Sequence, residues 1–390
     1  MHGTTRNLSA TSAVLIGTLA LASAMGIGRF SLTPIMPLMQ QDLGLTLSQG
    51  SLLATANYLG YLFGALVCAG MAPRSPGAIR WGLVGVGVFT LAMAPTHALP
   101  LWFAFRFAAG VASAFVLIGV SAWAMPILAY HDVGHWSGRI FAGVGLGIAF
   151  AGLVGLAAAV EAWSSQLTWI ALGIVASMLA VALWSPLKAE HRSVTLPVVS
   201  ASGPLSKRTL IVAACYSAFG YGYIIPATFL PSLARGYVND PAVFGMVWPV
   251  FGLAAAISTV AGARLLNRIS AKQLWTGTQW VLIAGVLAPV LAVNVATLSI
   301  AALCVGGSFM VITLAGIKEA MRLGGAHAAR AVGMMTAGFG IGQIAGPLIV
   351  ALFAGTGGAR VMPSLLAVLA LVVSNVVLYV VDDGAEIASQ

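Results

Sequence analysis

Charged residues are scarce in this chain. Asp, Glu, Lys and Arg make up 7% of its 390 residues, whereas a typical soluble domain contains about 25%. Because this number of charges is too small to cover a water-facing surface, we expect most of the exterior to face lipid. The acidic residues are the rarest, with nine Asp and Glu against 18 Lys and Arg. These cations lie between apolar runs rather than in one stripe or arm, which argues against a nucleic-acid partner.

Cysteine and histidine patterns that would support catalysis or metal binding are also missing. The three cysteines, Cys68, Cys215 and Cys304, lie inside apolar segments and are interpreted as small buried hydrophobes. His131 and His135 are four apart, but the Glu that a zinc-binding helix carries between them is absent. No phosphate-binding glycine loop with Lys and Ser or Thr occurs. The sequence therefore predicts no enzyme, no metal, no cofactor and no use of ATP.

What the chain does contain is apolar runs of about 20 residues, long enough to cross a bilayer. We expect an all-α membrane protein with twelve transmembrane helices. The predicted spans are 10–36, 50–70, 79–95, 99–125, 138–160, 166–184, 209–233, 243–265, 274–293, 296–317, 330–353 and 361–381.

An internal repeat divides these spans into two sets of six. The segment from Ser23 to Gly28, followed by Pro37, recurs 194 positions later as Ser217 to Gly222, followed by Pro231. The Gly143 to Gly147 string recurs at Gly338 to Gly342, 195 positions later. Repeated halves in a hydrophobic chain are typical of secondary transporters. We predict two pseudo-symmetric six-helix bundles, 1–184 and 209–390, joined by a linker at 185–208.

The distribution of Lys and Arg predicts the orientation. If the N-terminus is cytoplasmic, fourteen of the sixteen cations in the connections lie on the cytoplasmic side. Both termini and the 185–208 linker are then expected inside. The stretch from Arg6 to Ala24 resembles a signal peptide, but its end belongs to the repeated element, so we expect it to be retained.

Two loops and one helix carry motifs that resemble the major facilitator superfamily. Gly70 to Gly77, around Arg74, and Gly262 to Arg268 are similar to the loop that follows the second and eighth helices in that superfamily. Both lack its Asp, which weakens the gating role that the resemblance implies for Arg74 and Arg268. The stretch Arg106 to Ala114 is similar to the superfamily's Arg-x-x-x-Gly motif of the fourth helix, whose arginine is implicated in proton coupling.

The string from Gly26 to Pro37 resembles the YbfB/YjiJ-type branch of the superfamily. This resemblance implies a multi-pass protein of the bacterial inner membrane that moves its substrate by alternating access. The glycines spaced by four, Gly338, Gly342 and Gly346 in one helix and Gly143 and Gly147 in another, predict close helix packing rather than a nucleotide loop.

Two cations fall inside predicted spans, Arg29 and Arg106, and the resemblance places both on helices that line a central cavity. No Asp or Glu lies at mid-membrane depth. An unpaired buried charge is costly, so a small anion such as a carboxylate could supply the pairing. The alternatives are a snorkelling Arg29 and an Arg106 anchored to a backbone carbonyl.

Further polar and aromatic residues complete the predicted substrate site. Tyr223 aligns with Arg29 through the repeat and should lie opposite it. The other candidates for substrate binding are Asn57, Tyr58, Tyr61, Tyr216, Trp248 and Gln343, and Glu319 is a candidate for coupling or gating together with Arg106. Trp102, Trp136, Trp163 and Trp169 are instead expected in an interfacial aromatic belt.

We therefore expect a secondary transporter that moves a small organic anion, with proton coupling as an option. Efflux of amphipathic drugs or metabolites is the alternative within transporters. A non-transporting membrane sensor is the alternative outside them.

Overall fold

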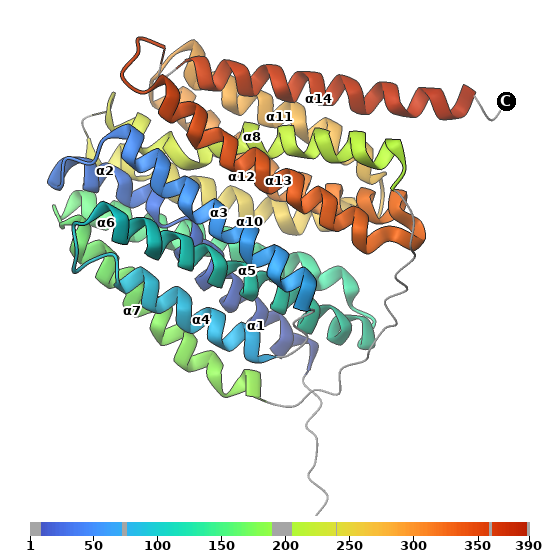
Figure 1. Cartoon of the computed structure of the whole chain (residues 1–390), viewed down its shortest axis with the longest axis horizontal. Coiled ribbons are helices and arrows are strands. Elements are labelled where there is room, and N and C mark those ends of the chain that lie inside the picture. Colours follow the sequence, from blue (N-terminus) through green and yellow to red (C-terminus); the bar gives the residue numbers. More distant parts are fainter. Residues whose placement is uncertain (1–8, 72–75, 189–204, 239, 359–360, 388–390) are drawn as a thin grey trace, which may run out of the picture.

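A computed structural model describes residues 9–71, 76–188, 205–238, 240–358 and 361–387. Throughout this part the chain forms helices joined by short connections, with no strand (Figure 1). The longer helices are α1 (Ala10–Leu21), α2 (Leu32–Asp42), α3 (Leu47–Met71), α4 (Pro76–Leu91), α5 (Leu99–Tyr130), α6 (Ser137–Val160), α7 (Ser165–Trp184), α8 (Lys207–Arg235), α10 (Val247–Leu265), α11 (Ala271–Leu291), α12 (Val295–Gly324), α13 (Ala328–Phe353) and α14 (Met362–Ile387). The short α9 (Pro241–Gly245) precedes α10.

Within the described residues, 11 helical segments are long and apolar enough to cross a membrane. They correspond to eleven of the predicted spans, and the protein is a multi-pass membrane protein. The remaining prediction, 79–95, corresponds to α4, which has 16 described residues and is shorter than a full span. Several helices extend beyond the predicted boundaries: α5 continues to Tyr130 and α12 to Gly324.

The first predicted span, 10–36, lies within one membrane-length segment, Ala10–Asp42, but this segment is not a single regular α-helix. After α1 the backbone widens into a π-helix, η1, over Ala22–Arg29, and the Phe30 N–H donates to the Met25 carbonyl at 3.1 Å. Two residues later α2 begins, and it runs to Asp42. A π-helix places more residues in each turn than an α-helix and is frequent at functional sites. The break sets Arg29 at the end of η1, where helix carbonyls lack partners within the helix.

Glycine faces bring helices into backbone contact, as their spacing predicted. A side chain added at Gly143 or Gly147 would strike the carbonyl of Thr18 or Ala22, so α6 lies directly on α1 and η1. In the second part of the chain, a side chain at Gly342 would strike the Ser217 carbonyl, so α13 lies directly on α8. Small residues permit this approach in membrane helices.

A longer glycine seam joins α6 to α10. Gly138, Gly145 and Gly152 are spaced by seven, and each faces a small or cyclic residue of α10. A Cβ at Gly138 would stand 2.6 Å from the Ala263 side chain, and one at Gly152 would stand 2.6 Å from the Pro249 nitrogen. The two helices therefore run antiparallel with almost no side chains between them.

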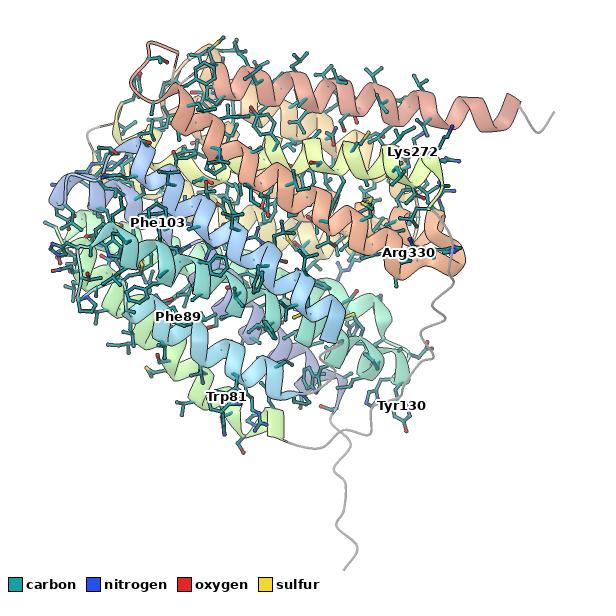
Figure 2. All side chains as sticks on the ribbon, viewed as in Figure 1. Trp81, Phe89, Phe103, Tyr130, Lys272 and Arg330 are labelled. Carbon is teal, nitrogen blue, oxygen red and sulfur yellow. The ribbon has the colours of Figure 1, made fainter. Side chains whose placement is uncertain are left out.

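Two of the cations predicted on the cytoplasmic side lie at one end of the bundle. Figure 2 shows Lys272 and Arg330, at the starts of α11 and α13, at the end of the molecule where α14 also ends. Most of the predicted 185–208 linker lies outside the described residues.

The predicted aromatic belt is wrong at two positions. Trp102 is 5% exposed and Trp169 is 1% exposed, so both are packed inside the protein. Trp136 and Trp163 are half-buried. The tryptophans face inward because α5 and α7 pack against other helices at these points. Trp102 donates its indole N–H to the Met93 carbonyl at 3.0 Å.

Candidate substrate site

Arg29 is the central charge of the candidate site. The side chain is 3% exposed, and its Nη2 donates to the amide oxygen of Gln343 on α13. Its Nε is buried and has no hydrogen-bond partner in the described protein. The guanidinium carbon lies 4.0 Å from the ring centroid of Tyr61 and 5.4 Å from that of Tyr58. Arg29 therefore points inward, toward α13, and does not snorkel.

Gln343 joins Arg29 to Tyr223. The amide nitrogen of Gln343 donates to the Tyr223 hydroxyl on α8, while its oxygen accepts from Arg29. Gln343 is 0% exposed and Tyr223 is 1% exposed. Arg29 and Tyr223, which align in the sequence repeat, thus meet at the two ends of one neutral amide.

Arg106 has a different environment. Its Nη1 donates to the Gly28 carbonyl at 3.2 Å and its Nη2 to the Arg29 carbonyl at 2.7 Å. The side chain is 1% exposed, and the indole ring of Trp169 lies 5.8 Å away. Asn57 donates to the Arg106 carbonyl at 2.8 Å. Arg106 therefore binds two backbone carbonyls at the C-terminal end of η1. This is the arrangement expected for an Arg106 that is anchored to the backbone.

The other predicted residues separate into two groups. Tyr58 and Tyr61 flank Arg29, and the Tyr58 hydroxyl lies 3.0 Å from that of Thr228 on α8. Tyr216 and Trp248 lie farther along a row of rings: their contacts are with Phe219 at 5.3 Å and with Phe251 at 4.6 Å.

Sequence reasoning missed the phenylalanines of this row. Ring centroids follow one another at 4.6 to 6.5 Å in the order Phe30, Trp248, Phe251, Phe309, Tyr223, Phe339, Phe219, Tyr216; we call these eight residues the aromatic row. Tyr223 is nearly parallel to both neighbours, at 4° to Phe309 and 7° to Phe339. A phenylalanine inside an apolar helix gives no signal that separates a binding surface from a core.

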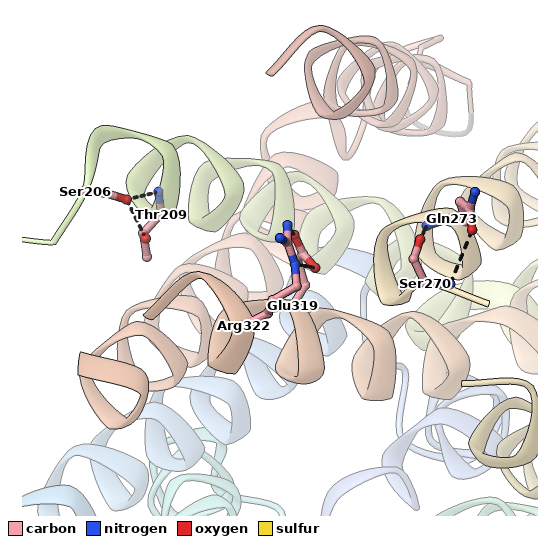
Figure 3. A network of polar contacts seen from close by, with 6 residues as sticks. All are labelled: Ser206, Thr209, Ser270, Gln273, Glu319 and Arg322. Carbon is pink, nitrogen blue, oxygen red and sulfur yellow. Dashed lines mark hydrogen bonds and ion pairs between the residues drawn. The ribbon is translucent and has the colours of Figure 1, made fainter. Parts of the chain in front are cut away.

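Of the predicted coupling and gating residues other than Arg106, Arg268 and Glu319 lie within the described part of the chain. Arg74 lies outside the described residues, and Arg268 is exposed in the turn after α10. Glu319 is buried on α12 and accepts two hydrogen bonds from Arg322, at 2.9 and 2.5 Å (Figure 3). Its sequence neighbour Lys318 donates instead to the Leu266 carbonyl at 2.5 Å.

Within the described ranges, no group of three or more His, Cys, Asp or Glu side chains is arranged to hold a metal ion. The chemistry available at Arg29 is ion pairing, hydrogen bonding and ring stacking. All three are means of holding a ligand.

A comparison with known families covers almost all of the chain. The family described as "Uncharacterised MFS-type transporter YbfB" matches residues 21–379. The chain belongs to this family. The matched range includes Arg29, Arg106 and every residue of the aromatic row.

One relative of this YbfB-type protein is also described as a transporter. It is 25% identical over 268 residues to "Uncharacterized MFS-type transporter YceJ" of Bacillus subtilis (strain 168). That match covers 63% of this chain and 64% of the relative, so it spans less than two thirds of the relative's length.

The fold is similar to that of a solved transporter. The crystal structure of the nucleoside transporter NupG superposes with a TM-score of 0.69 at 14% identity, covering 95% of this chain and 98% of NupG. A mutant form of NupG gives a TM-score of 0.68 over 95% and 100% of the two chains. At this identity the likeness concerns the fold.

Proposed function

We propose that this YbfB-type protein is a secondary transporter that moves a small organic anion by alternating access, with Arg29 as the group that binds the anion. The observation that carries the proposal is the state of the Arg29 guanidinium. It is buried, it is paired with no carboxylate among the described residues, and its Nη2 donates to a neutral amide.

The geometry of that guanidinium suits a carboxylate. Nε and Nη2 form one edge of the planar group, and this edge can donate two parallel hydrogen bonds to a carboxylate. At present Nη2 donates to Gln343 and Nε donates to no atom of the described protein. A substrate carboxylate would occupy both donors, displace the Gln343 oxygen and supply the missing negative charge. Such exchange of a neutral partner for a charged one favours binding because hydrogen bonds between ions are the stronger ones.

Arg106 serves in this proposal as a positioning residue. Its two carbonyl contacts fix the end of η1, and therefore fix where Arg29 projects. The proton-coupling role that the fourth-helix motif implies is compatible with this position, since a change in Arg106 would be transmitted to Arg29 through the shared backbone.

The proposed architecture is two six-helix halves, 1–184 and 209–390, with α4 as the third helix of the first half. Equivalent packing in the two parts supports it: α6 lies on α1 and η1 as α13 lies on α8, and α3 packs on α5 as α10 packs on α12. The proposed location is the bacterial inner membrane with both termini cytoplasmic, which the distribution of Lys and Arg supports.

Uptake into proteoliposomes tests the function. The parent protein should exchange a labelled small carboxylate across the membrane. Arg29→Lys keeps the charge but loses the planar fork, so exchange should weaken, and Arg29→Gln should lose it almost entirely. Unaltered exchange in both variants at equal protein content would contradict the proposal.

Efflux of amphipathic compounds is the second candidate, and one observation favours it. A cavity of about 320 Å³ lies between the ends of α8, α11 and α13, and its lining includes Ile225, Phe229, Val286 and Val350. This cavity and the aromatic row could accept apolar ligands without a carboxylate. Amphipathic cations that stabilise the protein while carboxylates do not would favour efflux. A protein that binds ligands but never exchanges them would favour the sensor.

A further inference from the structure

The proposed function specifies a substrate with an anionic group but not the shape of the rest of that molecule, which we call its body. Gln343 occupies the place that this body would take, because a carboxylate on the Nε and Nη2 edge of Arg29 displaces the Gln343 oxygen. The residues that surround Gln343 are therefore the ones that the body of the substrate would meet. They are Tyr223, which accepts its amide N–H, and Phe339, one turn earlier on the same face of α13.

The aromatic rings around Gln343 lie in nearly parallel planes. Tyr223 lies between Phe309 and Phe339, with centroids at 5.4 and 5.5 Å and planes within 4° and 7° of its own. Phe309 is buried, whereas Phe339, which also contacts Phe219 at 5.4 Å and Tyr216 at 5.3 Å, is half-buried and is therefore the more exposed of the two outer rings. A planar ring can add to such a stack, and a puckered aliphatic ring of the same size cannot do so as closely.

The guanidinium adds a second planar constraint. The guanidinium carbon lies 4.0 Å from the Tyr61 ring centroid. Bidentate hydrogen bonds to a carboxylate form along an edge of the guanidinium and in its plane. In an aromatic acid the carboxylate is conjugated with the ring and prefers the same plane. The edge of Arg29 therefore fixes the direction of the carboxylate and the tilt of the attached ring together.

From this arrangement we propose that the substrate is a small planar aromatic carboxylate, with its carboxylate on Arg29 and its ring against Tyr223 and Phe339. The inference rests on the proposed function, since it assumes that Arg29 binds the anion. It adds a requirement for planarity that anion binding alone does not impose.

Three matched compounds test the requirement on the purified full-length protein. Benzoate has both features, cyclohexanecarboxylate keeps the charge and size but is not planar, and benzamide keeps the ring but is neutral. We expect benzoate to bind roughly two- to tenfold more tightly than cyclohexanecarboxylate, the range measured for aromatic pairs. Benzamide should bind weakest. Affinities can be measured by calorimetry or by thermal shift.

Variants separate the ring contact from the charge. Phe339→Leu should remove most of the preference for benzoate while leaving the affinity for cyclohexanecarboxylate within about twofold. Phe63→Leu is a matched control, because Phe63 is 53% exposed on α3, in contact with Phe107 and outside the aromatic row. Arg29→Gln should abolish binding of both acids.

The outcomes separate the preference for an aromatic substrate from anion binding by Arg29. Equal affinity of the two acids, with both dependent on Arg29, would overturn the aromatic substrate and leave the anion transporter standing. Binding of neither acid would also overturn the aromatic substrate, and binding that is unchanged in Arg29→Gln would overturn both the aromatic substrate and the anion-binding role of Arg29. Because the comparison of the two acids uses the parent protein, it holds even if Phe339→Leu does not fold.

Discussion

Arg235 donates to the side chain of Gln41, the residue that stands 194 positions before it and therefore occupies the same place in the sequence repeat. It also donates to the Pro37 carbonyl at 2.5 Å. A second pair of repeat equivalents lies nearby, because the Thr33 hydroxyl donates to the Ala227 carbonyl at 3.0 Å, also 194 positions away. Residues can touch their own equivalents only where two related segments cross, so α2 and α8 meet on the axis of the repeat.

These contacts predict that the α2–α8 crossing must open during transport. With Gln41→Cys and Arg235→Cys combined, oxidation should join the two helices and stop exchange, and a reductant should restore it. Each single variant under the same oxidant is the control, because Cys68 and Cys215 are buried and Cys304 is partly buried. Full exchange by the cross-linked protein would show that this crossing stays closed throughout the cycle.

Arg106 should behave as an anchor of η1 rather than as a ligand of the substrate. Arg106→Gln removes two charged hydrogen bonds to carbonyl groups, and we expect the free energy of unfolding to fall by about 1.5–3 kcal/mol per bond. Thermal unfolding in detergent provides the measurement, with Arg29→Gln as the comparison. If Arg106→Gln abolished anion binding with no loss of stability, the residue would belong to the substrate instead.

A proton-coupling role of Arg106 makes a separate prediction. Arg106→Gln should then prevent accumulation driven by a pH gradient while counterflow of labelled substrate continues. Both assays can be run on the same proteoliposomes. Equal losses in both would assign the defect to substrate binding or folding.

The Gly342 face should tolerate no large side chain. An added side chain there meets the Ser217 carbonyl and, at 2.7 Å, the Tyr221 nitrogen, so Gly342→Leu forces α13 away from α8. We expect a stability loss of about 1–3 kcal/mol and about tenfold slower exchange. Leu348→Ala, at a position that is 38% exposed on the same helix, is the control and should change exchange little. Comparable defects in the two variants would remove the distinction.

The orientation can be tested by labelling. Cysteines introduced at Ser200 and Thr356 should react with an impermeant reagent from opposite sides of the membrane, Thr356 from outside. Ser200 lies outside the described residues, and its placement rests on the distribution of loop cations. Labelling of both positions from outside would contradict cytoplasmic termini.

The repeat and the apolar runs were enough to predict most of the fold. Eleven spans follow from hydropathy alone, because lipid requires long uninterrupted apolar helices. The meeting of Arg29 with Tyr223 could also be expected, because residues at equivalent places in two halves face each other across the axis. The repeat carries this information without any knowledge of side-chain conformation.

The break in the first span could not be predicted in the same way. A π-helix differs from an α-helix by hydrogen-bond register, and the residues from Ala22 to Arg29 have no composition that specifies it. The sequence likewise leaves two interpretations of Arg106 open, a cavity residue and an anchor, and only the structure shows that two of its donors bind the carbonyls that end η1. The aromatic row was missed for another reason: Phe309 and Phe339 belong to different helices, and only tertiary packing places them on either side of Tyr223.

The glycine seam between α6 and α10 has a mechanical consequence. Side chains added at Gly145 of α6 or Gly252 of α10 would meet backbone atoms of the other helix. On the opposite flank, a side chain added at Gly340 of α13 would first meet the side chain of Leu62 on α3, at 3.0 Å. A helix contact without interlocking side chains can act as a pivot, because the two helices can rotate against each other without any rotamer change. We expect α3 and α13 to move apart by a larger distance than α6 and α10, so that the passage opens mainly on the α3–α13 side. Spin-label distances across the two flanks, measured with and without substrate, would reveal this asymmetry.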